Sequence, residues 1–171
     1  RVMRVEIADT EQMEAFGRRL GAVLRAGDLV LLTGPLGAGK TTLTRGIGEG
    51  LGIRGPVQSP TFVLARTHPS LVGGAPLVHV DAYRLGTSGE LDDLDIDFAR
   101  SVVVAEWGAP FAAAVADVWW EVELDREVAR APGRDRKTQA VDQRKPFGQS
   151  VEADRQVLDS KHRGSDRGRP A

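Results

Sequence analysis

The chain of 171 residues is long enough for one domain with a sizeable core, and its formal net charge of −1 argues against bulk electrostatic binding to DNA, RNA or an anionic membrane. It contains no cysteine, which excludes disulfides, thiolate catalysis and cysteine-ligated zinc and fits a reducing cytoplasm. No signal peptide is evident and no apolar stretch approaches the roughly 18 residues of a membrane-spanning helix, so we expect a cytoplasmic protein.

Three elements are predicted before the first clear motif. Residues 4–7 alternate polar and apolar side chains, which is typical of a short strand. A helix should follow, with Asp9 or Thr10 as its N-cap and Gly27 as its stop. The apolar run at 29–32 then predicts a buried strand.

Residues 34–41 read GPLGAGKT and match the phosphate-binding pattern G-x-x-x-x-G-K-[ST] at every fixed position. A strand precedes them and a helix ending at Gly52 follows, which is the context that this motif requires. Glycines let successive N–H groups turn toward an anion, and the helix N-terminus adds its dipole. We therefore expect a nucleoside triphosphate site in which Lys40 meets phosphate and Thr41 binds Mg²⁺; the alternative is a glycine-rich turn with a chance lysine.

The rest of the body continues to interleave strands and helices. Strands are predicted at 62–67, 77–81, 101–107 and 118–124, and short helices at 89–96 and 110–116. This alternation predicts a three-layer α/β/α fold of the P-loop NTPase type with a mainly parallel central sheet.

Two of these strands end on a carboxylate, Asp81 and Glu106. Ligands of such sheets bind beyond the carboxyl ends of the strands, and Mg²⁺ prefers a few hard oxygens. Thr41 with Asp81 or Glu106 would meet that need, although either carboxylate could instead only cap the turn that follows it.

Other polar and aromatic residues leave alternatives open. Ser59 and Thr61 could sense a γ-phosphate or belong to an ordinary turn. Trp107 could offer its ring to a base or to a partner, whereas His79, between two valines, is interpreted as structural. Of the adjacent Trp119 and Trp120, one is expected in the core and the other at the surface.

The composition changes near residue 131. In the last 41 residues, 16 are charged and the net charge is +4, against −5 for the body. So few large apolar side chains cannot offset the entropy of ordering, so we divide the chain into a P-loop ATPase domain at 1–130 and a polar, disordered tail at 131–171.

Five blocks together resemble the TsaE (YjeE) family over roughly residues 5–125: GPLGAGKTTLTRG at 34–46, SPTF at 59–62, HVDAYRL at 79–85, ELDDLDID at 90–97 and VVVAEWG at 102–108. The resemblance implies an ATPase subunit for making N6-threonylcarbamoyladenosine at position 37 of tRNAs that read codons beginning with A. It also implies TsaB and TsaD as partners, with tRNA contacted only through that complex.

The same resemblance assigns roles to individual residues. It implies an ATP cradle, with Lys40 on phosphate, formed by Gly37, Ala38, Gly39, Lys40, Thr41 and Thr42. It makes Thr41 and Glu106 the Mg²⁺ ligands and Asp81 the residue that positions or activates water for hydrolysis. Ser59 and Thr61 would lie on a switch-like loop that senses the γ-phosphate. Trp107 would lie where the nucleotide and a partner bind. Further nucleotide contacts would lie near Thr10 and Arg134. Members of the family continue after the position of Leu124 with another strand, which the polar sequence here does not predict.

Three functions compete on these grounds. The first is a Mg²⁺-dependent ATPase that drives a tRNA-modifying complex. Its intrinsic rate should be low because no obvious arginine finger lies near the loop, and Arg84 is the nearest candidate. The second is a small-molecule kinase, which would need an acceptor-binding domain or lid, and no insertion in this sequence is long enough for one. The third is a non-hydrolysing, nucleotide-dependent scaffold, in which Asp81 would be dispensable.

Overall fold

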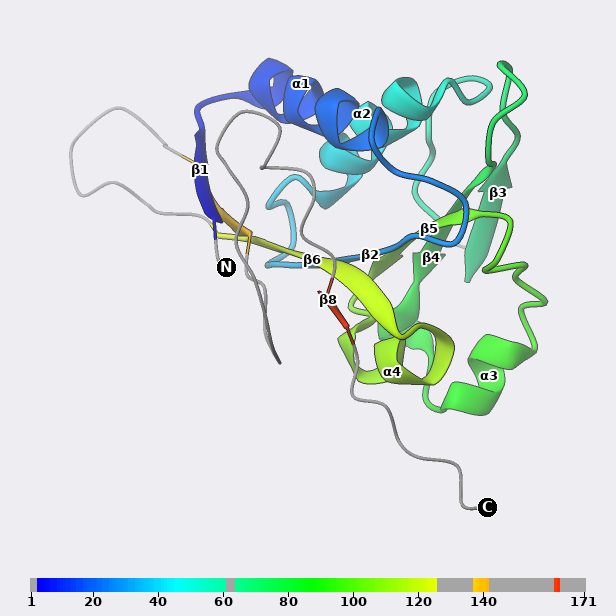
Figure 1. The fold of residues 1–171 in the computed structure, drawn as a ribbon. Helices are drawn as coiled ribbons and strands as arrows, with labels where there is room; N and C mark the ends of the chain where they lie inside the picture. The colour runs from blue at the N-terminus through cyan, green and yellow to red at the C-terminus, as the bar shows by residue number, and fades with distance from the viewer. Residues whose placement is uncertain (1–2, 61–63, 126–136, 142–161, 164–171) are drawn as a thin grey trace.

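A computed structural model describes residues 3–60, 64–125, 137–141 and 162–163 (Figure 1). A central sheet is covered by α1 (Thr10–Gly21) and α2 (Lys40–Leu51) on one face and by α3 (Ser88–Asp92) and α4 (Ala112–Val115) on the other. The predicted three-layer α/β/α architecture is confirmed.

The sheet is parallel at its centre and antiparallel at its edges. Its strands are β1 (Met3–Ile7), β2 (Leu29–Thr33), β3 (Ala65–His68), β4 (Leu77–Asp81), β5 (Val102–Glu106), β6 (Val118–Leu124), β7 (Lys137–Val141) and β8 (His162–Arg163). The spatial order is β1-β7-β6-β2-β5-β4-β3, and β8 pairs with β6 outside this path. The run β6-β2-β5-β4 is parallel, whereas β1, β3 and β7 pair antiparallel with their neighbours.

Capping residues set the start of α1 and the end of α2. The Asp9 carboxylate accepts the Gln12 N–H at 2.8 Å and so caps α1, as predicted, and Gly52 ends α2 with φ +68°. The predicted stop of α1 is wrong: the helix ends at Gly21, and Gly27 (φ +88°) instead turns the chain into β2. No helix in the described part of the chain is long and apolar enough to cross a membrane.

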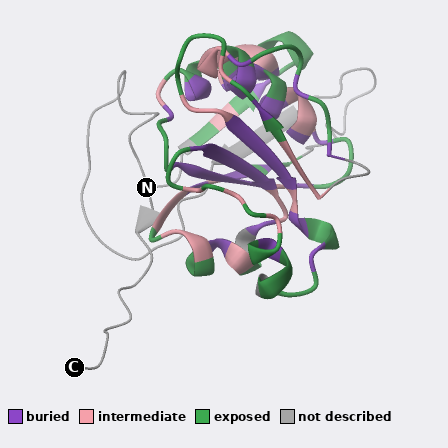
Figure 2. Ribbon diagram, turned by 90° about the vertical axis from the view of Figure 1, so that its right-hand side faces the viewer, coloured by how far each residue is buried: buried purple, intermediate pink, exposed green. Residues whose placement is uncertain are grey.

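Two hydrophobic cores lie on opposite faces of the sheet because successive side chains of each strand alternate. Val30 and Leu32 of β2 pack toward α1 and α2, while Leu29 and Leu31 pack toward α3 and α4. β2, β4 and β5 are buried on both faces, as Figure 2 shows for the central strands. Of the two tryptophans, Trp120 is 5% exposed in the first core, and Trp119 is half-buried against the second rather than fully exposed.

Two segments differ from expectation. β3 begins at Ala65, three residues later than predicted, and residues 61–63 lie outside the described part of the chain. The prediction of no strand after Leu124 is wrong for Lys137–Val141, since β7 pairs with both β1 and β6. The remaining tail, apart from β8, lies outside the described residues, so its disorder and the boundary at residue 131 stay predictions.

Candidate functional site

The glycine-rich loop connects the carboxyl end of β2 to the first turn of α2. Gly34 has φ +152° and lies so close to β6 that a Cβ there would be 2.4 Å from the carbonyl oxygen of Leu124. Gly39 has φ +108°, and its missing side chain leaves room for the Met13 methyl group, which would lie 2.8 Å from a Cβ. A side chain at either position would strain the backbone and displace a neighbour, so the loop requires glycine there.

The N-terminus of α2 presents its backbone to this loop without a side-chain cap. Gly39 is the N-cap residue and no side chain accepts a hydrogen bond from the first turn. The N–H groups there are therefore available for an anion, and the helix dipole favours a negative charge at the same point. Thr41 and Thr42 are the second and third residues of α2 and are half-buried.

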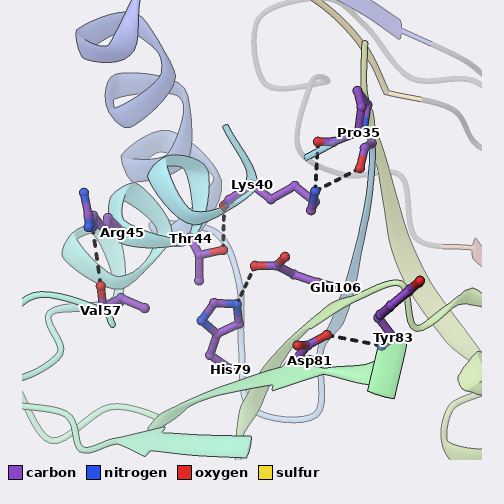
Figure 3. Close-up of polar contacts among 10 residues, drawn as sticks. Pro35, Lys40, Thr44, Arg45, Val57, His79, Asp81, Tyr83 and Glu106 are labelled. Carbon is purple, nitrogen blue, oxygen red and sulfur yellow. Dashed lines mark hydrogen bonds and ion pairs between the residues drawn. The ribbon is translucent and has the colours of Figure 1, made fainter. Parts of the chain in front are cut away.

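Lys40 places a buried positive charge beside the loop. The residue is 6% exposed, and its Nζ donates to the carbonyl oxygens of Gly34 at 2.8 Å and of Pro35 at 3.1 Å (Figure 3). The ion pairs formed among the described residues do not include Lys40. A buried ammonium whose hydrogen bonds go to neutral carbonyl oxygens is suited to binding an anion.

Two carboxylates stand at the ends of neighbouring parallel strands, as predicted from the sequence. Asp81 of β4 is in register with Glu106 of β5, so both side chains leave the same face of the sheet. The Asp81 Oδ1 accepts the Tyr83 N–H at 3.2 Å, and the Glu106 Oε1 lies 3.0 Å from the His79 Nε2. Both residues are half-buried, so each carboxylate is held and still accessible.

Trp107 lies over the lysine. Its backbone has φ +60°, which is uncommon for a bulky residue, and its N–H donates to the Leu32 carbonyl at 3.0 Å. The ring centroid is 4.9 Å from the Lys40 Nζ and 5.9 Å from the ring of Tyr83, which is 74% exposed. The indole thus covers the cationic end of the site and forms a cation–π contact with it.

The remaining predicted residues are less central. Thr10 is the first residue of α1 and is exposed, and the nearby Met13 joins the start of α1 to the loop at Gly39. Ser59 is exposed between α2 and β3, and Arg84 is exposed in the 3₁₀ turn η1 (Ala82–Arg84). Thr61 and Arg134 lie outside the described residues.

The contact between His79 and Glu106 was not predicted from the sequence. The imidazole is fully buried, yet it contacts Glu106 rather than only filling the core. The sequence does contain a signal for this contact. His79 precedes Asp81 by two positions, and the two-residue period of a strand puts both side chains on one face of the sheet.

The site can be compared with known proteins. A sequence model of the family described as "Threonylcarbamoyl adenosine biosynthesis protein TsaE" matches residues 7–136. A Streptomyces coelicolor protein named tRNA threonylcarbamoyladenosine biosynthesis protein TsaE is 59% identical over 119 residues, which are 68% of this chain and 80% of that protein. A Mycobacterium leprae protein of the same name is 50% identical over 125 residues, 68% of this chain and 78% of the relative.

A solved structure also resembles the fold. The crystal structure of Bacillus subtilis YdiB superimposes with a TM-score of 0.63 at 28% sequence identity. The match covers 82% of this chain and 84% of that one.

Proposed function

The chain belongs to the TsaE family of threonylcarbamoyl adenosine biosynthesis proteins, and from this we propose that it is a Mg²⁺-dependent ATPase that supports formation of N6-threonylcarbamoyladenosine at position 37 of tRNA. One observation carries the proposal: the phosphate-binding loop and Lys40 lie at the same edge of the sheet as Asp81 and Glu106. Phosphoryl transfer requires a site that binds the polyphosphate, with carboxylates beside it that can bind a metal ion and orient a water molecule.

The loop and the first turn of α2 are the proposed ATP cradle. Its members are Gly37, Ala38, Gly39, Lys40, Thr41 and Thr42. Their backbone N–H groups would bind phosphate oxygens, while the Lys40 Nζ would exchange its two carbonyl acceptors for phosphate oxygens of opposite charge. Hydrogen bonds between two charged groups are stronger than those to neutral carbonyls, so we expect the Lys40 Nζ to bind phosphate in preference to the two carbonyl oxygens.

Thr41 and Glu106 are the proposed Mg²⁺ ligands. Among the described residues, no group of three or more His, Cys, Asp or Glu side chains could hold a metal ion. That fits Mg²⁺, which commonly takes one or two protein oxygens and completes its octahedral shell with phosphate oxygens and water. Bound Mg²⁺ would neutralise part of the charge on the phosphates.

Asp81 is the proposed residue for hydrolysis. Its carboxylate is held by the Tyr83 N–H and faces Glu106 across the strand register, so it can accept a hydrogen bond from a water near the phosphates. Thr10, Ser59, Thr61 and Trp107 are proposed contacts to the nucleotide or to a partner, and they are secondary to this machinery.

TsaB and TsaD are the proposed partners, and tRNA would be reached only through that complex. The net charge of −5 on the body, residues 1–130, supports this indirect contact, because direct binding to a nucleic acid backbone needs clustered positive charge. The proposed location is the cytoplasm, without contact to DNA or membrane.

The test is phosphate release from Mg·ATP by the purified chain, alone and with TsaB and TsaD. We expect release to rise with the partners and to fall to background in Asp81→Ala, whose ATP affinity should stay near that of the unaltered chain. Asp117→Ala is the matched control, because this exposed carboxylate precedes β6 at the opposite end of the sheet. Normal ATP binding without hydrolysis in either setting would refute the ATPase and favour a nucleotide-dependent scaffold.

A further inference from the structure

His79 is a polar residue in a position that otherwise suits an aliphatic one. It is 0% exposed in the middle of β4, and its strand neighbours Val78 and Val80 belong to the core. Its side chain shares the α2 face with Leu77, since residues two apart in a strand point the same way. Among the described residues its Nδ1 has no hydrogen-bond partner, so packing alone does not account for an imidazole here.

Within the described part of the chain, the imidazole forms one hydrogen bond, with Glu106. The distance between the His79 Nε2 and the Glu106 Oε1 is 3.0 Å, and the carboxylate points toward the imidazole in Figure 3. An ionised carboxylate only accepts hydrogen bonds, so the proton of this bond lies on Nε2 and the imidazole is the donor. The Glu106 side chain is 15% exposed, which leaves its other oxygen accessible from the site.

We propose that His79 is a positioning residue that orients the Glu106 carboxylate for Mg²⁺, an inference that rests on the proposed function. Glutamate has three rotatable side-chain bonds, and a donor fixed in the core to Oε1 restricts the carboxylate to one orientation. Oε2 is then the oxygen that would bind Mg²⁺. Hydrogen bonds from outside the coordination shell orient metal ligands in this way, and their loss commonly weakens metal affinity by about 10- to 100-fold.

A purely structural role makes a different prediction. If His79 only filled space, replacing it would lower the stability of the fold and leave the Mg²⁺ requirement unchanged. His68 provides the matched comparison, because it is a second buried histidine, 6% exposed, on the adjacent strand β3. No hydrogen bond among the described residues joins His68 to Glu106.

The experiment measures the binding of AMP-PNP to the full chain by titration calorimetry over a series of Mg²⁺ concentrations, with thermal unfolding as a second readout. The variants are His79→Leu, His79→Gln, His79→Asn and His68→Leu. A glutamine amide nitrogen can reach the place of Nε2, whereas the shorter asparagine amide cannot. We expect the Mg²⁺ midpoint to rise about tenfold or more in His79→Leu and His79→Asn and to return near the original value in His79→Gln. His68→Leu should lower stability without moving the midpoint.

The outcomes separate the two proposals. Equal Mg²⁺ midpoints in the unaltered chain and in folded His79→Leu overturn the positioning role. If His79→Leu does not fold, equal midpoints in the Gln and Asn variants, which both keep a polar amide in the core, overturn it as well. If the unaltered chain binds no AMP-PNP at any Mg²⁺ concentration, the nucleotide function itself fails and the inference falls with it.

Discussion

At the scale of single residues, the site combines buried charge with backbone strain. Lys40 is buried beside carbonyl oxygens, and Trp107 covers it while adopting a φ of +60°. Such a conformation costs on the order of 1–3 kcal/mol in a bulky residue and persists only where the surroundings enforce it. Here the Trp107 N–H is held by the Leu32 carbonyl of β2, so the end of the parallel sheet enforces it.

The buried His68 makes stability depend on pH. Burial, and then the nearby His79 and Arg66, lower the pKa of His68 from its ordinary value of 6.5. Below pH 6.5, His68 binds a proton more readily in the unfolded chain than in the folded chain. The free energy of unfolding therefore falls as the pH falls. Well above pH 6.5 the residue is uncharged in both states, and the contribution of His68 to this dependence disappears.

We therefore expect His68→Leu to flatten the acid side of the stability profile. Denaturant unfolding of both chains at a series of pH values between about 7.5 and 5.5 measures the effect. The difference in unfolding free energy between the variant and the unaltered chain should shift in favour of the variant as the pH falls. Two profiles that stay parallel over the range would show that His68 does not titrate differently in the folded state.

At the scale of elements, α1 and α2 pack backbone against backbone. A Cβ on Gly46 would lie 2.4 Å from the Glu14 carbonyl oxygen, and one on Gly17 would lie 2.5 Å from the Leu43 carbonyl oxygen. Backbone atoms cannot rotate away as a flexible side chain can, so a methyl group at either place must separate the helices. Since the glycine-rich loop leads into the N-terminus of α2, this contact also fixes where the loop lies against α1.

Gly46→Ala tests that packing. We expect the free energy of unfolding to fall by about 1–3 kcal/mol, the usual effect of overpacking, although alanine is the better helix former. Gly89→Ala in α3 is the control, because the nearest atom to its Cβ would be 3.8 Å away and the substitution should be neutral or slightly stabilising. Equal unfolding free energies in the two variants would mean that α1 and α2 can move apart to accept the methyl group at little cost in stability.

At the scale of the whole molecule, the order of the strands places the glycine-rich loop, Glu106 and Asp81 at the same edge of the sheet. β2 lies between β5 and β6, and β5 lies between β2 and β4, all parallel, so three consecutive carboxyl ends supply the loop, Glu106 and Asp81. These residues are far apart in the chain, and they lie at one edge of the sheet because the crossover connections return β2, β4 and β5 in the same direction.

The edge of the sheet depends on the C-terminal part of the chain. β7 is paired with β1 over five residue pairs, and it joins β1 to β6. A chain that ends at Asp125 should lose at least about 2 kcal/mol of unfolding free energy, because each backbone hydrogen bond contributes about 0.5–1.5 kcal/mol and β1 would keep no strand partner. A chain that ends at Val141 keeps this ladder and should unfold near the full-length chain in a denaturant titration. Equal stability of the two truncated chains would contradict a structural role for β7.

Much of the site was predictable because its signals are local. The phosphate loop is one continuous motif, and the strands ending at Asp81 and Glu106 are short apolar runs that close on a carboxylate. The roles of these residues, by contrast, stay predictions until nucleotide binding is measured. β7 was not predicted because Lys-Thr-Gln-Ala-Val has little apolar character, and its strand conformation comes from hydrogen bonds to two distant partners.

The sequence by itself determined the family, the glycine-rich loop, the alternation of strands and helices and the residues that end the strands. These depend on spacing within a few positions, and backbone sterics and hydrophobic periodicity act over that range. Only the tertiary structure decided that His79 contacts Glu106, that Trp107 covers Lys40 and that β7 lies between β1 and β6. Each of these contacts joins segments that are distant in the chain, and their geometry follows from strand order and register, which a local pattern does not encode.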